Sequence, residues 1–195
     1  MPEQRRIVLA SASPRRKEIL AKTGLCFEID RSGFDEQLDP GVEPHRLART
    51  LARHKAQAVS SRYEDALIIA ADTFIAFHGQ MLGKPHTPPE ARRMLALLSG
   101  RTHSVITGYA VIDTRTGKLA SGSEETQVVF RRLSKAEISA YVKTGEPLDK
   151  AGAYAIQGIG AMLVQRIDGD YLNVVGLPLV PLLRTLGKFG VRVLR

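Results

Sequence analysis

Short apolar runs alternate with segments of helical periodicity along the chain. Residues 7–10 and 67–71 are continuous apolar runs, each of the length that a buried strand needs. Between them, residues 44–62 repeat apolar positions at helical spacing, which predicts a long helix. This alternation of strand and helix patterns favours an α/β architecture.

Local start and turn signals predict the remaining elements. Residues 105–113 and 125–133 alternate in polarity around a turn at 114–117, which predicts a hairpin and therefore a mixed rather than a purely parallel sheet. Two capping boxes, which begin at Thr87 and Ser134, predict helix starts. Residues 74–77 are expected to continue the strand over 67–71 towards a turn at 78–79. Further strands are expected at 27–31, 161–167 and 172–175, and helices at 14–22, 88–98, 135–144 and 178–189.

The length of 195 residues suits a single domain over residues 1–195, built as two lobes. No apolar run approaches the roughly 18–20 residues of a membrane helix. Residues 1–6 lead directly into the first strand, so we expect no signal peptide. The one cysteine, Cys26, excludes an internal disulfide and is expected to be a small core residue. It argues for a reducing compartment, and we expect the cytoplasm.

The net charge of +8 predicts an anionic partner without saying which one. Aromatic residues make up only 6% of the chain and tryptophan is absent, so few side chains are available to stack on bases. Lysine and arginine are also spread along the whole chain. We therefore expect no membrane partner and no stable complex with nucleic acid, and take a homodimer as the default assembly.

The passage from the first strand to the first helix is a candidate anion site. Ser13 followed by Pro14 is a helix-start signal, with Ser11 just before it and Arg15 and Arg16 just after it. Two cations at a helix N-terminus oppose the helix dipole unless an anion binds there, where N–H groups and guanidinium groups would both hold it. A solvated basic helix end is the alternative.

Two acidic positions could hold a metal ion. Asp72 ends the most apolar predicted strand, at an edge where α/β folds place ligands. Asp35 and Glu36 follow the second strand, in a loop that could meet Asp72. Carboxylates suit Mg²⁺ or Mn²⁺. The alternatives are an Asx turn at Asp72 and a solvated acidic pair in the loop.

Three further side chains are candidates for binding. Lys84 lies in a tight connection between Gly83 and Pro85, which should hold it in place. Lys55 lies on the apolar face of the helix over residues 44–62, where extension of its ammonium group to solvent is the simplest explanation. Gln157 stands among small residues that leave its amide accessible, although a glycine-rich packing turn would give the same pattern.

Several familiar catalytic patterns are absent from the sequence. There is no GxxxxGK[ST] phosphate loop and no GxSxG elbow, and the glycine pair Gly158 and Gly160 lacks the third glycine of a dinucleotide loop. The five histidines show no metal-ligand spacing, which argues against zinc.

The order of the motifs resembles the Maf family, the septum-formation-inhibitor family of nucleoside triphosphate pyrophosphatases. The resemblance covers residues 7–183. It rests on SASPRR at 11–16, KA at 55–56, ADT at 71–73, GKP at 83–85, TG at 107–108, AGAYAIQG at 151–158, GDY at 169–171 and VGLP at 175–178.

The resemblance implies an elongated mixed α/β fold related to inosine triphosphate pyrophosphatases, with two lobes around a central cleft. It implies hydrolysis of a nucleoside triphosphate to the monophosphate and pyrophosphate, with a divalent metal such as Mg²⁺ or Mn²⁺. The residues implied are Ser11, Arg15, Arg16, Lys55 and Lys84 for the phosphates, Glu36 and Asp72 for the metal and water activation, and Thr73 and Gln157 for the base. Lys84 would also stabilise the charge that develops in catalysis.

Two positions indicate a branch of the family. Arginine at Arg15 and threonine at Thr73 resemble the branch that acts on dTTP and UTP. The branch that favours 7-methyl-GTP tends to have an aromatic residue and a glutamine there. The alternatives are a pyrophosphatase for modified nucleotides and a non-catalytic regulator that binds nucleic acid or acts in cell division. Carboxylates beside the basic groups argue against a nucleic-acid groove.

Overall fold

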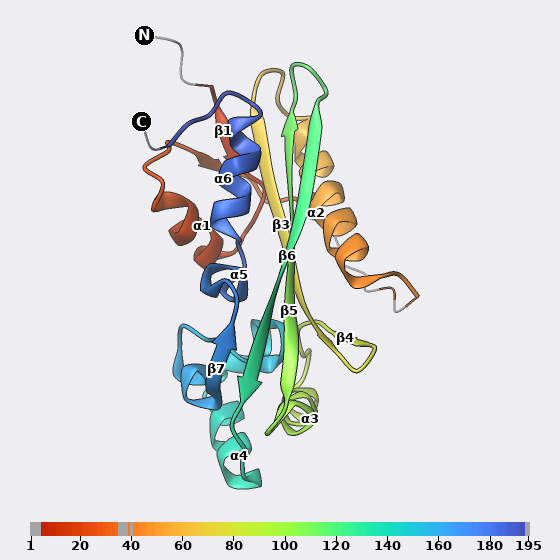
Figure 1. Cartoon of the computed structure of the whole chain (residues 1–195), viewed down its shortest axis with the longest axis vertical. Helices are drawn as coiled ribbons and strands as arrows, with labels where there is room; N and C mark the ends of the chain where they lie inside the picture. The colour runs from red at the N-terminus through yellow and green to blue at the C-terminus, as the bar shows by residue number, and fades with distance from the viewer. Residues whose placement is uncertain (1–4, 35–38, 40, 194–195) are drawn as a thin grey trace. The chain divides into compact units, whose positions relative to one another are not determined.

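The structure is a computed structural model that describes residues 5–34, 39 and 41–193. Within these residues there are seven strands: β1 Ile7–Leu9, β2 Glu28–Ile29, β3 Leu67–Phe77, β4 Gln80–Leu82, β5 Thr102–Asp113, β6 Leu119–Phe130 and β7 Val164–Asp168. The helices are α1 Pro14–Ala21, α2 Pro44–Ser60, α3 Pro88–Leu98, α4 Lys135–Lys143, α5 Tyr171–Val175 and α6 Leu179–Gly187 (Figure 1). Three 3₁₀ helices are η1 Glu146–Asp149, η2 Ala151–Ala153 and η3 Ile159–Leu163.

The chain divides into two compact units. The first contains Met1–Asp72, Thr107–Glu124 and Gly176–Arg195, and the second contains Thr73–Ile106 and Glu125–Val175. The strand order is β2-β1-β3-β5-β6-β7, with β4 paired to β3, and the strands β3, β5 and β6 each contribute residues to both units. β1 pairs in parallel with β2 and β3, whereas β4 and β7 pair antiparallel with β3 and β6. The predicted mixed α/β fold is therefore confirmed.

In the first unit, neighbouring residues of β5 point to opposite sides of the strand, as the strand period requires. Gly108 faces α2, where an added Cβ would lie 2.0 Å from the carbonyl oxygen of Ala48. The next residue, Tyr109, accepts a hydrogen bond of 3.4 Å from Thr185 of α6. Figure 1 shows α2 and α6 on opposite sides of these strands. The missing side chain of Gly108 thus lets α2 approach the sheet closely, two helical turns before Lys55.

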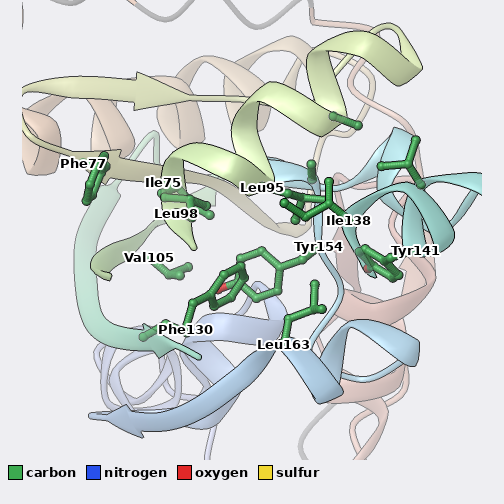
Figure 2. Close-up of a cluster of buried hydrophobic side chains, with 14 residues drawn as sticks. Ile75, Phe77, Leu95, Leu98, Val105, Phe130, Ile138, Tyr141, Tyr154 and Leu163 are labelled. Atoms are coloured by element: carbon green, nitrogen blue, oxygen red, sulfur yellow. The ribbon is translucent and has the colours of Figure 1, made fainter. Parts of the chain in front are cut away.

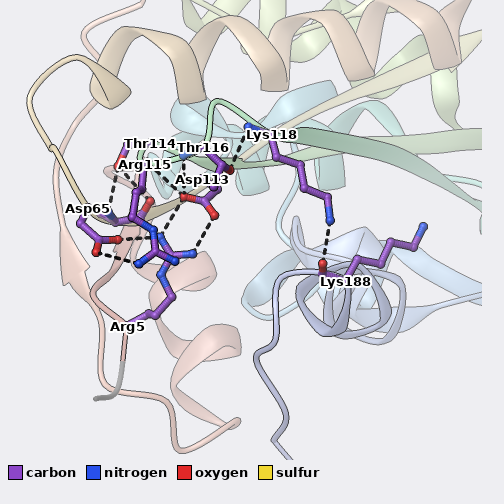
Figure 3. A network of polar contacts seen from close by, with 9 residues as sticks. Arg5, Asp65, Asp113, Thr114, Arg115, Thr116, Lys118 and Lys188 are labelled. Carbon is purple, nitrogen blue, oxygen red and sulfur yellow. Dashed lines mark hydrogen bonds and ion pairs between the residues drawn. The ribbon is translucent and has the colours of Figure 1, made fainter. Parts of the chain in front are cut away.

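A network of charged and polar groups closes the first unit at the turn between β5 and β6 (Figure 3). The Arg5 guanidinium donates to both carboxylate oxygens of Asp113, at 2.7 and 2.8 Å, and to Asp65 at 2.6 Å. Asp113 also accepts from the backbone N–H groups of Arg115 and Thr116. Arg5 beside it holds the pKa of Asp113 well below its usual range. The network joins residues that precede β1 and β3 to the end of β5.

The second unit is built around an apolar cluster with aromatic side chains at its centre (Figure 2). The rings of Phe130 and Tyr154 pack edge to face with centroids 4.7 Å apart, and His103 packs against both. The Tyr154 hydroxyl and Nε2 of His103 share a hydrogen bond of 3.0 Å. Burial lowers the pKa of His103 to about 4. Tyr141 of α4 and residues from α3 complete the cluster, which supports the 3₁₀ segments that follow α4.

Predictions from local signals are confirmed at the helix starts. Ser13 caps α1 with Pro14 at its first position, and Thr87 and Ser134 form the two expected capping boxes. The strand expected at 172–175 is wrong, because these residues lie in α5. Gly169 has a φ of +127° and the Asp170 carboxylate accepts from the N–H of Leu172 at 2.8 Å, which together begin a helix.

Two other expectations are wrong. Asp72 does not end a strand but lies inside β3, which residues 74–77 continue to Phe77 as expected. The end of β3 pairs with β4, a strand that the sequence did not predict. Cys26 is exposed rather than buried, in the segment between α1 and β2. Among the described residues, no helix is both long and apolar enough to cross a membrane.

Candidate active site

The N-terminus of α1 gathers the serine and arginine side chains that the sequence singled out. Ser11 is buried just after β1, and its Oγ accepts from the N–H of Ser13 at 3.2 Å and from Nη1 of Arg16 at 3.4 Å. The Oγ of Ser13 accepts from the N–H of Arg16 at 3.5 Å. Nε of Arg16 donates to the carbonyl oxygen of Gly176 at 2.8 Å. The guanidinium of Arg16 is therefore held on two sides, while Arg15 is half-buried on the same turn.

Lys55 and Asp72 form a buried ion pair in the first unit. The Lys55 ammonium donates to Oδ1 of Asp72. The two residues are only 5% and 1% exposed, so neither charge is solvated as it would be at the surface. The prediction that the ammonium group of Lys55 extends to solvent is therefore wrong. A buried lysine needs a paired anion, and Asp72 supplies it.

The parallel strands β1 and β3 lead to the helix start and to the ion pair, respectively. Leu9 of β1 is level with Ile69 of β3 in a parallel pair, and the N–H of Ala10 donates to the Ile69 carbonyl at 2.7 Å. The paired positions end there, because the chain turns after β1, where the N–H of Ser11 donates to the Leu9 carbonyl at 2.9 Å; Asp72 lies three residues further along β3. The first unit thus contains both the buried carboxylate–ammonium pair and the start of α1.

The second unit carries the other predicted site residues, Thr73, Lys84 and Gln157. Thr73 follows Asp72 within β3 and is half-buried, whereas Lys84 is exposed in the loop after β4. The loop at Lys84 is fixed through its backbone, since the Gly83 carbonyl accepts from the N–H of Gly152 at 2.9 Å and Pro85 is buried. This agrees with the prediction that the residues flanking Lys84 hold it in place.

Gln157 is exposed in the turn between η2 and η3. Its amide is accessible, as the small residues around it predicted. The N–H of Gly158 donates to the carbonyl oxygen of Ala155 at 3.2 Å, which closes the turn on which Gln157 stands. The candidate residues of the two units thus differ in exposure. The ionic groups of the first unit are buried or half-buried, whereas the ammonium of Lys84 and the amide of Gln157 in the second unit are exposed.

For a divalent metal, the described residues offer the carboxylate of Asp72. Asp35 and Glu36 lie outside the described residues. Among the residues that are described, no group of three or more histidine, cysteine, aspartate or glutamate side chains could hold a metal ion. Mg²⁺ is commonly held by one or two carboxylates together with substrate phosphates, so the carboxylate of Asp72, which also pairs with Lys55, is a ligand of the kind that such a metal takes.

The sequence did not predict three polar residues that make structural contacts in the second unit. Asn173 is fully buried and donates from Nδ2 to the Val105 carbonyl and to Oγ1 of Thr126, each at 3.0 Å. An asparagine inside an apolar run was the available signal. Tyr141 and Glu146 bind the turn that carries Gln157, and no spacing in the sequence indicates this.

This chain is similar to known proteins along almost all of its length. The family model of the Maf-like proteins matches residues 6–189. The chain is 53% identical over 188 residues to the dTTP/UTP pyrophosphatase of Moorella thermoacetica, which covers 96% of this chain and 97% of that protein. It is 50% identical over 188 residues to the dTTP/UTP pyrophosphatase of Geobacter sulfurreducens, which covers 96% of this chain and 98% of that one. The chain belongs to the Maf family.

Among solved structures, the dITP/XTP pyrophosphatase of Mycobacterium abscessus is similar with a TM-score of 0.41 and 15% identity, over 66% of this chain and 75% of that one. These values are too low for the likeness to bear on the fold or the activity of this chain.

Proposed function

We propose that this chain hydrolyses dTTP and UTP to the nucleoside monophosphate and pyrophosphate. The observation that carries the proposal is the buried Lys55–Asp72 pair in the same unit as the Ser11–Arg16 cluster, in a chain about half identical to proteins named dTTP/UTP pyrophosphatases. The first unit then holds both a carboxylate that can take a proton and groups that can hold an anion.

The phosphates bind to the cationic and N–H groups of the chain. Ser11, Arg15 and Arg16 at the start of α1 hold the β- and γ-phosphates, which become the pyrophosphate that leaves. Lys84 adds positive charge from an exposed position on a loop whose backbone is fixed. Lys55 pairs with the carboxylate of Asp72 and adds positive charge for the phosphates.

The chemical step is attack of water on the α-phosphorus. A new bond forms between the water oxygen and this phosphorus, and the bond to the α–β bridging oxygen breaks. Asp72 takes the proton of the water, and the positive groups stabilise the charge that builds on the leaving oxygen. A divalent cation held by Asp72 and Glu36 would supply further positive charge at the phosphate oxygens.

The base contacts Thr73 and Gln157. An exposed glutamine amide offers both a donor and an acceptor, and uracil and thymine present the complementary N3–H and O4 groups. Arg15 and Thr73 are also the two residues that resemble the pyrimidine branch of the family. The cytoplasm is the proposed compartment, in keeping with a chain that has one cysteine.

The test is release of pyrophosphate from dTTP, UTP, CTP, GTP and 7-methyl-GTP with Mg²⁺ or Mn²⁺. We expect dTTP and UTP to be cleaved in preference to the others. Preference for 7-methyl-GTP would support pyrophosphate release but overturn the proposed preference for uracil and thymine. Release from none of them would favour a binding or regulatory protein.

A further inference from the structure

We propose that Tyr141 and Glu146 are positioning residues for Gln157, and that they set the discrimination of the enzyme between pyrimidine bases. The inference rests on the proposed function, in which Gln157 contacts the base. It assigns a role to two residues that touch neither substrate nor metal, and whose contacts lie wholly within the second unit.

Glu146 binds the turn on its C-terminal side. Its carboxylate accepts from the N–H of Ile159 at 3.0 Å and from the N–H of Gly160 at 2.9 Å. It also accepts from the hydroxyl of Tyr141 at 2.7 Å. A carboxylate suits this place because it only accepts, and all three of its partners are donors.

Tyr141 binds the same turn on its N-terminal side. Its hydroxyl accepts from the N–H of Ala155 at 3.1 Å while it donates to Glu146. Two linked side chains therefore hold both ends of the segment 155–160, and Gln157 lies between the points of attachment. We call Tyr141 and Glu146 with these four hydrogen bonds the clamp.

The two glycines of this segment make room for the clamp. A Cβ added to Gly158 would lie 2.2 Å from Oε2 of Glu146, and one added to Gly160 would lie 2.5 Å from the Tyr141 hydroxyl. The Gly158–Gly160 pair, which resembles part of a dinucleotide loop in the sequence, is thus explained by the approach of Glu146 and Tyr141.

The clamp connects an exposed residue to a rigid part of the second unit. Tyr141 is 4% exposed and its ring lies in the apolar cluster of Figure 2, whereas Gln157 is exposed. The position of its backbone sets which edge of the base the Gln157 amide can reach, and a mobile turn would let the amide follow either uracil or cytosine. Ordering this turn before substrate binds also lowers the cost of binding.

The first experiment compares kcat/KM for dTTP with kcat/KM for CTP in wild type and in Tyr141→Phe. The substitution keeps the ring in the core and removes the hydroxyl. We expect the dTTP/CTP ratio to fall about threefold to tenfold, which is the effect of one or two hydrogen bonds, through a higher KM for dTTP and a nearly unchanged kcat. Glu146→Gln, which turns an N–H₂ group toward a donor, should lower the ratio similarly.

Tyr154→Phe is the matched control. It removes another buried tyrosine hydroxyl of the same cluster, one that bonds to His103 and not to the segment 155–160. We expect it to leave the dTTP/CTP ratio unchanged even where it lowers stability. An equal fall in Tyr154→Phe and Tyr141→Phe would overturn the proposal, since it would reflect loss of stability alone.

The decisive measurement repeats Tyr141→Phe in a Gln157→Ala background. If Tyr141 acts through Gln157, the second substitution has no further effect on the ratio. A fall of the same size in both backgrounds, or no fall in either, overturns the role of the clamp. Amide hydrogen exchange of Ile159 and Gly160 should quicken in Tyr141→Phe, and unchanged exchange would also overturn it. Failure of the proposed function is recognised separately, by absence of pyrophosphate release in the wild type or by an unchanged ratio in Gln157→Ala alone.

Discussion

The candidate site residues of the two units are held in different ways. In the first unit the side chains themselves make the structural contacts: Lys55 bonds to Asp72, and Arg16 bonds to the Gly176 carbonyl. In the second unit, Lys84 and Gln157 are exposed, and other groups hold the backbone near them. In the proposed function, the same side chains therefore serve fold and chemistry in the first unit, whereas these two tasks fall to different residues in the second.

This difference teaches where activity and stability can be separated. Removal of one member of a buried ion pair leaves the other charge in a medium that cannot solvate it. Removal of an exposed side chain leaves the fold nearly unchanged. Activity should be separable from stability by single substitutions in the second unit, but not at the ion pair of the first.

The largest effect is expected for Asp72→Asn. Loss of the proton acceptor should lower pyrophosphate release by at least roughly 10²-fold. The buried ammonium of Lys55 would lose its anion, which should cost about 3–5 kcal/mol of the free energy of unfolding. Urea denaturation and a pyrophosphate assay measure the two effects. The double variant Lys55→Met/Asp72→Asn should recover stability and remain inactive; full activity in Asp72→Asn would remove this residue from the mechanism.

Lys84→Ala should give a similar loss of activity without the loss of stability. Removal of a cation that stabilises the transition state should lower kcat/KM by roughly 10²-fold. Because Lys84 is exposed, the substitution should change the free energy of unfolding of the protein by less than about 0.5 kcal/mol. A large fall in stability would show that Lys84 has a structural role and would contradict the contrast between the units.

Asp113→Asn should have the opposite result, a loss of stability without a loss of activity. We expect the free energy of unfolding at neutral pH to fall by about 1.5–3 kcal/mol, the range for a hydrogen bond to a charged group. The pKa of Asp113 in the folded protein lies below its usual value near 3.8, because Arg5 pairs with the carboxylate. The pair therefore stabilises the fold above that usual value, and the contribution is lost as pH falls below it.

The pH dependence can be measured by urea denaturation between neutral and acidic pH. Wild type should lose stability more steeply than Asp113→Asn as the pH falls below about 4, the unfolded pKa range of aspartate. Parallel curves would show that the Arg5–Asp113 pair does not contribute, whatever its geometry.

Gln157→Ala is expected to have the smallest effect. Loss of one or two hydrogen bonds to the base should raise KM for dTTP about twofold to tenfold. The free energy of unfolding should stay within about 0.5 kcal/mol of wild type, since the amide is exposed. Thermal unfolding and steady-state kinetics on dTTP and CTP measure both; an unchanged KM for both nucleotides would remove Gln157 from the base site.

The helix starts were predictable from the sequence, because they depend on interactions between neighbouring residues. The capping residues Ser13, Thr87 and Ser134 mark real helix starts because each satisfies backbone N–H groups within its own first turn. The strand expected at 172–175 failed because the turn at Gly169 and the carboxylate of Asp170 outweigh the preference of an apolar, β-branched run.

The candidate site was predictable in its members and not in their contacts. Helical spacing correctly placed Lys55 on the buried face of α2, but only the packing of α2 on the sheet shows that its ammonium meets Asp72. That packing depends on Gly108, whose Cβ would collide with Ala48. The clamp was not predictable, because Glu146 meets Ile159 and Gly160 across a turn whose shape no short motif encodes.

The exposed position of Cys26 makes this chain ready for single-point chemical labelling. Its thiol is the only one in the sequence and it belongs to the first unit. A second cysteine in place of Met162, which is 66% exposed in the second unit, would give a molecule with one fluorophore on each unit. Energy transfer between the two dyes would then follow, during turnover and in real time, any change in the separation of the units.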